Sequence, residues 1–224
     1  MSRRTYGQYC GFARALELVG ERWALLIVRD LFVGPQRFTD LRNGLPGIPT
    51  NILTARLKEL EEAGLVRRSV SPRPGGSVVY ELTEYGTELE DSVVALSRWG
   101  AKSLGEPGAG EIVTPESLVM ALRTTFRPER ARRKHVSYEL HVGPTVIHAV
   151  VDVGKVDVGV GPLPRTDLTI EAGPGVRALM AGEISPAEAL ERRIVRITGN
   201  TALLDEFART FRIDPKPLGE KVKR

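Results

Sequence analysis

Between residues 50 and 58, hydrogen-bonding side chains recur without a carboxylate among them. They are Thr50, Asn51, Thr54, Arg56 and Lys58. The acidic residues of the same stretch come only later, at Glu59, Glu61 and Glu62. Base edges in the major groove of DNA are read by such hydrogen bonds, and phosphates are bound by Arg, Lys, hydroxyl groups and helix N-terminal amides. The pattern therefore predicts contact with double-stranded DNA. An ordinary solvated helix face is the alternative, and Arg56 could instead pair with Glu59 or Asp40.

The element that must position these side chains is a helix predicted over residues 50–63. Leu53, Leu57 and Leu60 recur at helical spacing, so one face is built to be buried. Pro49 suits the start of this helix and Gly64 suits a left-handed exit.

A short positioning helix is predicted just before it, over residues 37–42. This segment supplies Arg37 and Thr39 as further candidates for DNA contact. Leu45-Pro46-Gly47 forms the turn into the longer helix.

Two short apolar segments, residues 65–70 and 78–82, follow the longer helix. The connection Ser71-Pro72-Arg73-Pro74-Gly75-Gly76 is rich in turn residues, so the pair is predicted to form a β-hairpin. Arg73 lies at its tip, where a cation suits backbone phosphate or the minor groove. A solvated loop residue is the alternative for Arg73.

Three more helices are predicted in this part of the chain, over residues 12–20, 22–33 and 83–102. The second is apolar on most sides and should be the central core helix. The third carries an apolar stripe with little of its own domain left to cover, which predicts a homodimer interface shared with helix 12–20. The candidate interface residues are Leu16, Leu89, Val93, Leu96 and Trp99. A homodimer would place two DNA half-sites about one helical turn apart.

Several separated motifs in this order resemble the HxlR-type, MarR-like winged helix-turn-helix transcriptional regulators. They are Trp23 with Leu25-Leu26-Ile27, Arg37-Phe38-Thr39-Asp40-Leu41, Leu53-Thr54-Ala55-Arg56-Leu57-Lys58-Glu59-Leu60, Ala63-Gly64-Leu65-Val66 and Tyr80-Glu81-Leu82-Thr83. The resemblance covers residues 8–104. It implies a homodimeric DNA-binding protein with a transcriptional role, whose two recognition helices enter successive major grooves.

The rest of the chain predicts a second domain. Domain 1 spans residues 1–104, a Gly- and Pro-containing linker spans residues 105–112, and domain 2 spans residues 113–224. Domain 2 begins with a helix capped by Thr114-Pro115. Strands are predicted over residues 136–142, 146–153, 156–160, 167–172 and 194–198, with helices at 176–181, after Ser185-Pro186 and after Asn200. The fold class is α+β, with a sheet covered on one face by helices.

Three motifs of this second domain resemble the sterol-carrier-protein fold, an α/β sandwich-like arrangement. They are Asp167-Leu168-Thr169-Ile170, Ala178 to Pro186 and Arg196 to Leu204. The resemblance covers residues 113–212 and implies an apolar tunnel for a fatty acyl chain, sterol or similar small molecule. Arg192-Arg193 stand where that family often has a glycine before the last strand. No residue is assigned a ligand contact.

Cys10 is the single cysteine, which excludes an intrachain disulfide framework and a Cys-rich zinc site. The HxlR-type family often carries an N-terminal cysteine here, and in some members that thiol senses oxidants, so Cys10 is a redox candidate by resemblance. Arg14, Arg3 and Arg4 could lower its pKa. A small packing residue near the dimer interface is the alternative.

Composition fits a soluble, cytoplasmic protein of one or two domains. The chain has 224 residues, 42% of them hydrophobic, and a formal net charge of +4. No signal peptide or membrane-spanning stretch is recognisable. His141 and His148 could face each other across a hairpin if its turn has four residues, but they lack a third metal ligand.

No metal, cofactor or catalytic residue is predicted, and the chain is not expected to be an enzyme. The sequence therefore predicts a homodimeric transcriptional regulator modulated by an apolar small molecule in domain 2. The alternatives are a redox-responsive regulator acting through Cys10 with a non-sensing second domain, or a lipid-binding carrier.

Overall fold

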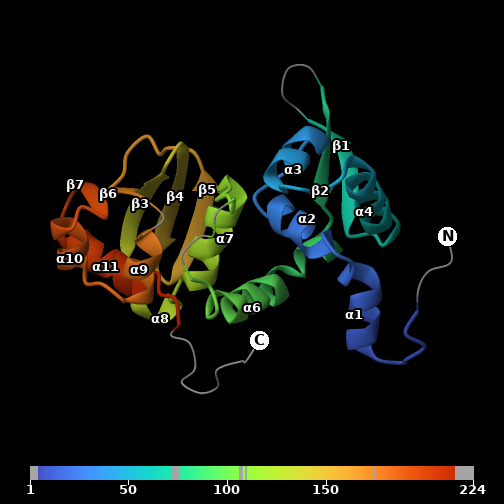
Figure 1. Cartoon of the computed structure of the whole chain (residues 1–224), viewed down its shortest axis with the longest axis horizontal. Helices are drawn as coiled ribbons and strands as arrows, with labels where there is room; N and C mark the ends of the chain where they lie inside the picture. Colours follow the sequence, from blue (N-terminus) through green and yellow to red (C-terminus); the bar gives the residue numbers. More distant parts are fainter. Residues whose placement is uncertain (1–4, 72–75, 106–107, 109, 174, 215–224) are drawn as a thin grey trace. The chain divides into compact units, whose positions relative to one another are not determined.

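The chain divides into two compact units, Met1–Val93 (unit 1) and Val94–Arg224 (unit 2). The computed structural model in Figure 1 describes residues 5–71, 76–105, 108, 110–173 and 175–214. Three residues of the predicted linker, 106, 107 and 109, lie outside the described residues. Each unit has its own core and is described by itself.

Unit 1 has the element order of a winged helix-turn-helix. Its elements are α1 (Gly11–Val19), α2 (Ala24–Leu31), α3 (Phe38–Gly44), α4 (Thr50–Glu62), β1 (Val66–Val70), β2 (Val78–Leu82) and α5 (Glu84–Thr87). The helix α6 (Glu90–Ala101) begins in unit 1 and ends in unit 2. Helix α2 contacts α3, α4 and β2, which makes it the central helix of the unit, as predicted.

The core of unit 1 forms where α2 meets α4. Ile27, Val28 and Leu31 are at most 3% exposed, and Leu53, Leu57 and Leu60 of α4 at most 1%. The predicted buried face of α4 is therefore confirmed. Gly64, with φ +73°, takes the left-handed conformation predicted for the residue after the helix.

A backbone bridge ties the entry of α3 to the hairpin. The N–H of Gln36 donates to the carbonyl of Tyr80 at 2.9 Å, and the N–H of Tyr80 donates to the carbonyl of Gln36 at 2.8 Å. Sequence periodicity gave no signal for this pairing, because one residue pair forms no alternating pattern. It fixes the hairpin beside the helix-turn-helix.

The single helix predicted over residues 83–102 is wrong, because the segment forms α5 and then, after a turn at Glu88–Leu89, α6. Thr83 caps α5: its hydroxyl accepts from the N–H of Gly86 at 3.0 Å and donates to the carbonyl of Gly64 at 2.6 Å. A Cβ at Gly86 would lie 2.1 Å from the carbonyl oxygen of Leu65. The first turn is thus held against Gly64 and Leu65, the residues that follow α4.

Unit 2 is a five-stranded sheet with helices. Its further elements are α7 (Pro115–Thr125), α8 (Pro128–Ala131), β3 (His135–Val142), β4 (Thr145–Asp152), β5 (Lys155–Val160), β6 (Leu168–Ala172), α9 (Val176–Ala181), α10 (Pro186–Glu191), β7 (Val195–Gly199) and α11 (Ala202–Thr210). The strand order is β5-β4-β3-β6-β7. Strands β3 and β6 are parallel and the other neighbours antiparallel. The α+β class and the five strands are confirmed, with ends shifted by about one residue.

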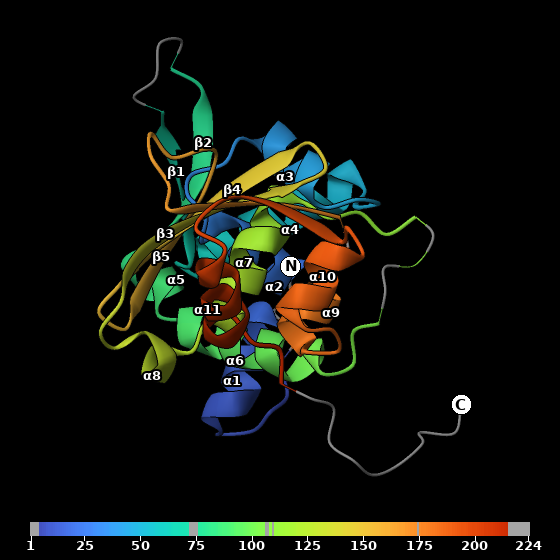
Figure 2. The same ribbon diagram turned by 90° about the vertical axis from the view of Figure 1, so that its left-hand side faces the viewer.

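One face of this sheet is apolar and covered. Tyr138, Leu140, Ile147, Leu168 and Ile170 are at most 2% exposed. Helix α7 packs on β4 and β5, and the ring of Phe207 in α11 lies 5.3 Å from that of Tyr138. Figure 2 shows α7, α9, α10 and α11 on one side of the strands. The predicted one-sided helical cover is therefore present.

On the opposite face, His148 is paired in register with Glu139, and His141 with Val146. The two histidines could face each other only across a four-residue turn, and they do not, because Val142 pairs with Thr145 and leaves only Gly143 and Pro144 in the turn. His141 Nε2 instead lies 2.6 Å from Glu139 Oε1. Among the described residues no three His, Cys, Asp or Glu side chains gather as a metal site would require.

The described helices were also compared with what a membrane-spanning helix requires. None of them combines the length and the apolar composition needed to cross a membrane.

Candidate nucleic-acid interface

Four of the predicted DNA-contacting residues form the exposed side of α4. Thr50, Asn51, Thr54 and Lys58 are all exposed, whereas Leu53 and Leu57 between them are buried. The first turn of α4 contains no acidic residue, and no side chain caps it. Its N-terminal N–H groups therefore remain available as donors to an anion.

Within this exposed face the polar groups are only loosely engaged. The hydroxyl of Thr54 donates to the carbonyl of Thr50 at 2.9 Å, which leaves its oxygen free to accept. Lys58 Nζ lies 3.7 Å from Glu62 Oε1, and both side chains are well exposed. Such a surface pair contributes about 1 kcal/mol at most, so a phosphate can compete for Lys58.

Arg56 does not belong to this face. Its side chain is 16% exposed and its guanidinium lies beside Glu21, at 3.4 Å, and beside Glu59. Of the alternatives raised from the sequence, the pair with Glu59 is present, whereas Asp40 instead accepts from the N–H of Arg37 at 3.2 Å. Arg56 lines a pocket behind α4.

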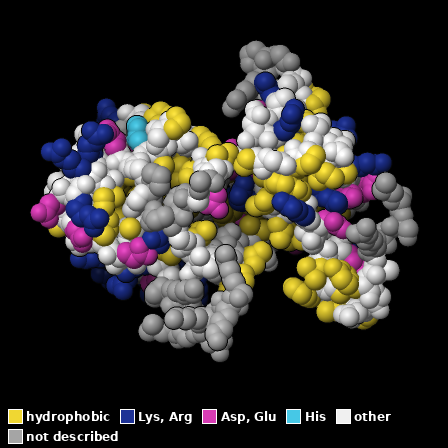
Figure 3. Space-filling model, viewed as in Figure 1, with side chains coloured by type: hydrophobic (Ala, Val, Ile, Leu, Met, Phe, Trp, Pro, Cys, Tyr) yellow, Lys and Arg dark blue, Asp and Glu magenta, His cyan; other side chains and the backbone are white. Residues whose placement is uncertain are grey.

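The two candidates before α4 are both exposed. Arg37 precedes α3 in an extended conformation and Thr39 lies in its first turn. On the side shown in Figure 3, Lys and Arg side chains lie over the part of unit 1 that holds α3 and the hairpin.

The hairpin pairs β1 with β2 in antiparallel register, from Val66 opposite Leu82 to Val70 opposite Val78. Arg67 Nε lies 3.0 Å from Glu81, and Arg68 lies 2.9 Å from Glu61 with its guanidinium 5.7 Å from the ring centre of Tyr80. The two arginines at its base are thus engaged within unit 1. Arg73, the predicted basic tip, lies outside the described residues.

Cys10 is exposed and precedes α1. Hydrogen bonds from the backbone N–H groups of Ala13 and Phe12 hold the pKa of its thiol below the ordinary value. Within one protomer the thiol is therefore accessible and does not fill a packing site.

The predicted dimer residues divide by exposure. Leu16, Leu96 and Trp99 are exposed, Leu89 is half-buried, and Val93 is 6% exposed within the protomer. Sequence reasoning missed Tyr9 and Phe12, which are among the most exposed apolar side chains. Phe12 lies four residues before Leu16 in α1, and this helical spacing is the signal that could have found it, whereas Tyr9 lies before the helix. Figure 3 shows a hydrophobic group over α1.

Residues 18–107 match the family described as HxlR-like helix-turn-helix. The HTH-type transcriptional regulator YodB of Bacillus subtilis is 40% identical over 94 residues, which are 42% of this chain and 83% of that protein. The chain belongs to the HxlR-like helix-turn-helix family.

Another HxlR-like relative is the HTH-type transcriptional regulator Rv3095 of Mycobacterium tuberculosis. It is 44% identical over 107 residues, 48% of this chain and 66% of that protein. The chain thus spans slightly less than two thirds of the mycobacterial regulator's length. The HxlR-like match ends at residue 107, so it includes α4 and the hairpin but no strand of the five-stranded sheet.

Solved structures of similar proteins also align with this HxlR-like chain. The redox regulator HypR in its oxidised form is 32% identical, covering 43% of this chain and 99% of that one, with a TM-score of 0.40. The reduced form of YodB from B. subtilis is 34% identical, covering 45% of this chain and 100% of that one, with a TM-score of 0.38.

Proposed function

We propose that the chain is a DNA-binding transcriptional regulator that acts as a homodimer and reads its operator with α4. The observation that carries the proposal is the exposed polar side of α4, whose first turn holds no acidic residue, in a chain of the HxlR-like family. The relatives named above are HTH-type transcriptional regulators, which fits this assignment.

In the proposed complex the residues of α4, the start of α3 and the hairpin have different roles. An Asn side chain can donate to and accept from adenine in the major groove, so Asn51 would supply sequence discrimination, assisted by Thr54. Lys58, Arg37, Thr39 and Thr50 would bind backbone phosphates, which positions the helix without reading sequence. Arg73 keeps its predicted role at the hairpin tip, and Arg56 would act by holding α4 in place.

The test begins with selection of duplexes from a randomised pool by the purified protein. Affinities for the enriched and the randomised duplex are then compared in Asn51→Ala and Lys58→Ala. Lys155→Ala, an exposed lysine in β5 of unit 2, is the matched control.

Asn51→Ala should lose affinity for the enriched duplex alone, by about 1–3 kcal/mol. Lys58→Ala should weaken both duplexes alike and lower the slope of log K against log salt by about 1. Lys155→Ala should leave both unchanged. If Asn51→Ala and Lys58→Ala behave like Lys155→Ala, α4 is not the recognition helix.

For unit 2 we propose a sterol-carrier-like domain that holds an apolar small molecule and modulates DNA binding. Two features support this. The sheet has one apolar face covered by helices, and the hydroxyl of Tyr138, buried against Phe207, has no hydrogen-bond partner among the described residues. Burial raises the pKa of Tyr138, so this hydroxyl stays neutral and could donate to a ligand oxygen.

Native mass spectrometry of the freshly purified protein tests this second proposal. A reproducible apolar adduct, reduced in Tyr138→Phe, would support it. A bare wild-type protein would instead favour a non-sensing unit 2, with redox control through Cys10 as the remaining route of regulation.

A further inference from the structure

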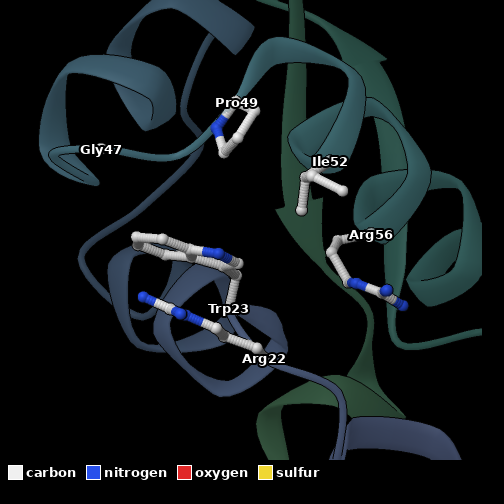
Figure 4. A pocket seen from close by; sticks show the side chains of 6 residues that line it. All are labelled: Arg22, Trp23, Gly47, Pro49, Ile52 and Arg56. Carbon is white, nitrogen blue, oxygen red and sulfur yellow. The ribbon is translucent and has the colours of Figure 1, made fainter.

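A pocket of about 340 Å³ lies behind α4, between that helix and the start of α2. It is lined by Arg22, Trp23, Gly47, Pro49, Ile52 and Arg56. Figure 4 shows Arg22 and Trp23 on one side and Pro49, Ile52 and Arg56 across from them. The volume is within the range of small-molecule sites, which begins near 300 Å³.

The aromatic wall of this pocket is held in an uncommon conformation. Trp23 precedes α2 with φ 81° and ψ −21°, in the left-handed region, which a bulky residue rarely occupies. The Arg22 guanidinium lies 5.1 Å from the centre of the Trp23 ring. Backbone strain of this kind concentrates at binding sites, where it presents a side chain to a ligand.

The opposite wall carries an unused donor. The Nε of Arg56 is buried and has no hydrogen-bond partner in the described part of the chain. Glu21 and Glu59 pair with the terminal nitrogens of the same guanidinium and are not among the lining residues. A buried N–H without an acceptor is costly, so a ligand that supplies an oxygen would relieve it.

None of the six lining residues is acidic and two are cationic, while Trp23, Pro49 and Ile52 are apolar. A flat ring system would stack on Trp23, and a carboxylate would accept from arginine. We infer that the pocket binds a planar aromatic carboxylate.

The pocket is placed to act on DNA recognition. Successive residues of a helix are about 100° apart, so residues two apart lie on nearly opposite sides. Ile52 is two residues from the exposed Thr50 and Thr54, and Arg56 is two residues from the exposed Thr54 and Lys58. A ligand would therefore press on the back of α4 and bias its position against α2, a consequence that rests on the proposed DNA-binding function.

The test uses the full-length protein and 2-naphthoate as the probe, without DNA. Trp23 and Trp99 are the only two tryptophans of the sequence, so a ¹⁵N-labelled sample gives two indole N–H signals, assigned with Trp99→Phe. Isothermal titration calorimetry supplies the dissociation constants. Arg22→Ala is compared with Arg42→Ala, since both arginines are exposed and Arg42 does not line the pocket.

Binding should shift the Trp23 indole signal and leave that of Trp99 unchanged. Arg22→Ala should weaken 2-naphthoate about tenfold, whereas Arg42→Ala should not weaken it. The neutral 2-naphthamide should bind wild type and Arg22→Ala alike.

Three outcomes would overturn the inference. The first is no shift of the Trp23 signal at millimolar 2-naphthoate. The second is equal loss in both arginine variants. The third is a Trp23 signal that depends on protein concentration but not on 2-naphthoate, which would assign the pocket to a second copy of the chain. Because DNA is absent, these results do not depend on whether α4 binds an operator.

Discussion

At the scale of single residues, Cys10 combines exposure with a perturbed acidity. The N–H groups of Ala13 and Phe12 stabilise its thiolate, so its pKa is lowered. We expect the rate of alkylation by iodoacetamide to reach half its maximum at a lower pH than for glutathione measured alongside. Urea-unfolded protein is the control, because unfolding removes both N–H donors. Coinciding curves for folded and unfolded protein would contradict the prediction.

Glu139 in β3 is a buried carboxylate, at 8% exposure. Burial alone would raise its pKa, but hydrogen bonds from His141 and from the N–H of Leu163, the latter 2.9 Å long, lower it. We expect Glu139→Gln to destabilise the protein by about 1–3 kcal/mol in urea unfolding at pH 7. Glu171→Gln, on the neighbouring strand with a largely exposed side chain 3.6 Å from Arg196, should change stability by less than about 0.5 kcal/mol.

The same carboxylate predicts a pH dependence. Because the folded-state pKa of Glu139 lies below the unfolded value of about 4.3, its contribution is complete above that pH. It is lost as the pH falls through the folded-state value. The stability difference between wild type and Glu139→Gln should therefore shrink below about pH 4. A difference that is constant from pH 7 to pH 3 would show that the ionised form is not what stabilises the fold.

At the scale of elements, Gly86 decides where α5 lies. A Cβ there would approach the Leu65 carbonyl to 2.1 Å, and that carbonyl is backbone that cannot move aside. We expect Gly86→Ala to destabilise unit 1 by about 1–3 kcal/mol, measured by urea unfolding with Trp23 fluorescence in a Trp99→Phe background. Gly11→Ala, in α1 with open space around the position, should be neutral or slightly stabilising. Equal effects of the two substitutions would remove the steric explanation.

The elements differ in how far the sequence predicts them. Leu53, Leu57 and Leu60 specify α4 because their spacing is periodic, and the prolines and glycines between β1 and β2 specify the hairpin. The break after α5 was not predicted, since helical spacing continues through Leu89 and gives no sign of the close approach between Gly86 and the carbonyl of Leu65. The spacing of apolar residues shows which side of a helix or strand is buried. It does not show where the backbone of another segment packs closely against that helix or strand.

In the candidate site too, some features follow from residue spacing and others depend on tertiary packing. The exposure of Asn51 and Thr54 follows from the wheel of α4 alone. The position of Arg56 does not, because its partner Glu21 lies 35 residues earlier and is brought near only by the packing of α4 on α2. The pocket with Trp23 depends on that packing too. Sequence reasoning therefore predicted the exposed polar face of α4 and missed the pocket behind it.

At the scale of the whole molecule, strand neighbours far apart in sequence were the least predictable feature. Strands β3 and β6 lie side by side in parallel, although 25 residues separate Val142 from Leu168. Alternation identified each strand, but only the folded sheet shows which edges meet and that Glu139 lies opposite His148. The five strands were thus predictable one by one, and their order was not.

Dimer formation is the remaining property of the whole molecule, and it can be tested by a substitution in α6. Trp99 is 72% exposed and Leu96 51%, one helical turn apart on the same side. Covering such a stripe with a second copy would contribute on the order of 2 kcal/mol or more from the indole alone, so Trp99→Asp should weaken a dimer by about 30-fold or more. Sedimentation velocity between 1 and 50 µM, taken as roughly the range of a moderate dimer, measures this.

The matched control is Val153→Asp, in the turn between β4 and β5. Val153 is also exposed, at 55%, and its φ of 44° suits aspartate better than valine, so the fold should tolerate the change. If both variants dissociate, added negative charge rather than a lost contact is responsible. If Trp99→Asp remains dimeric, the copies meet elsewhere. The next residues to change are then Tyr9, Phe12 and Leu16, in and just before α1, because they are a further group of exposed apolar side chains.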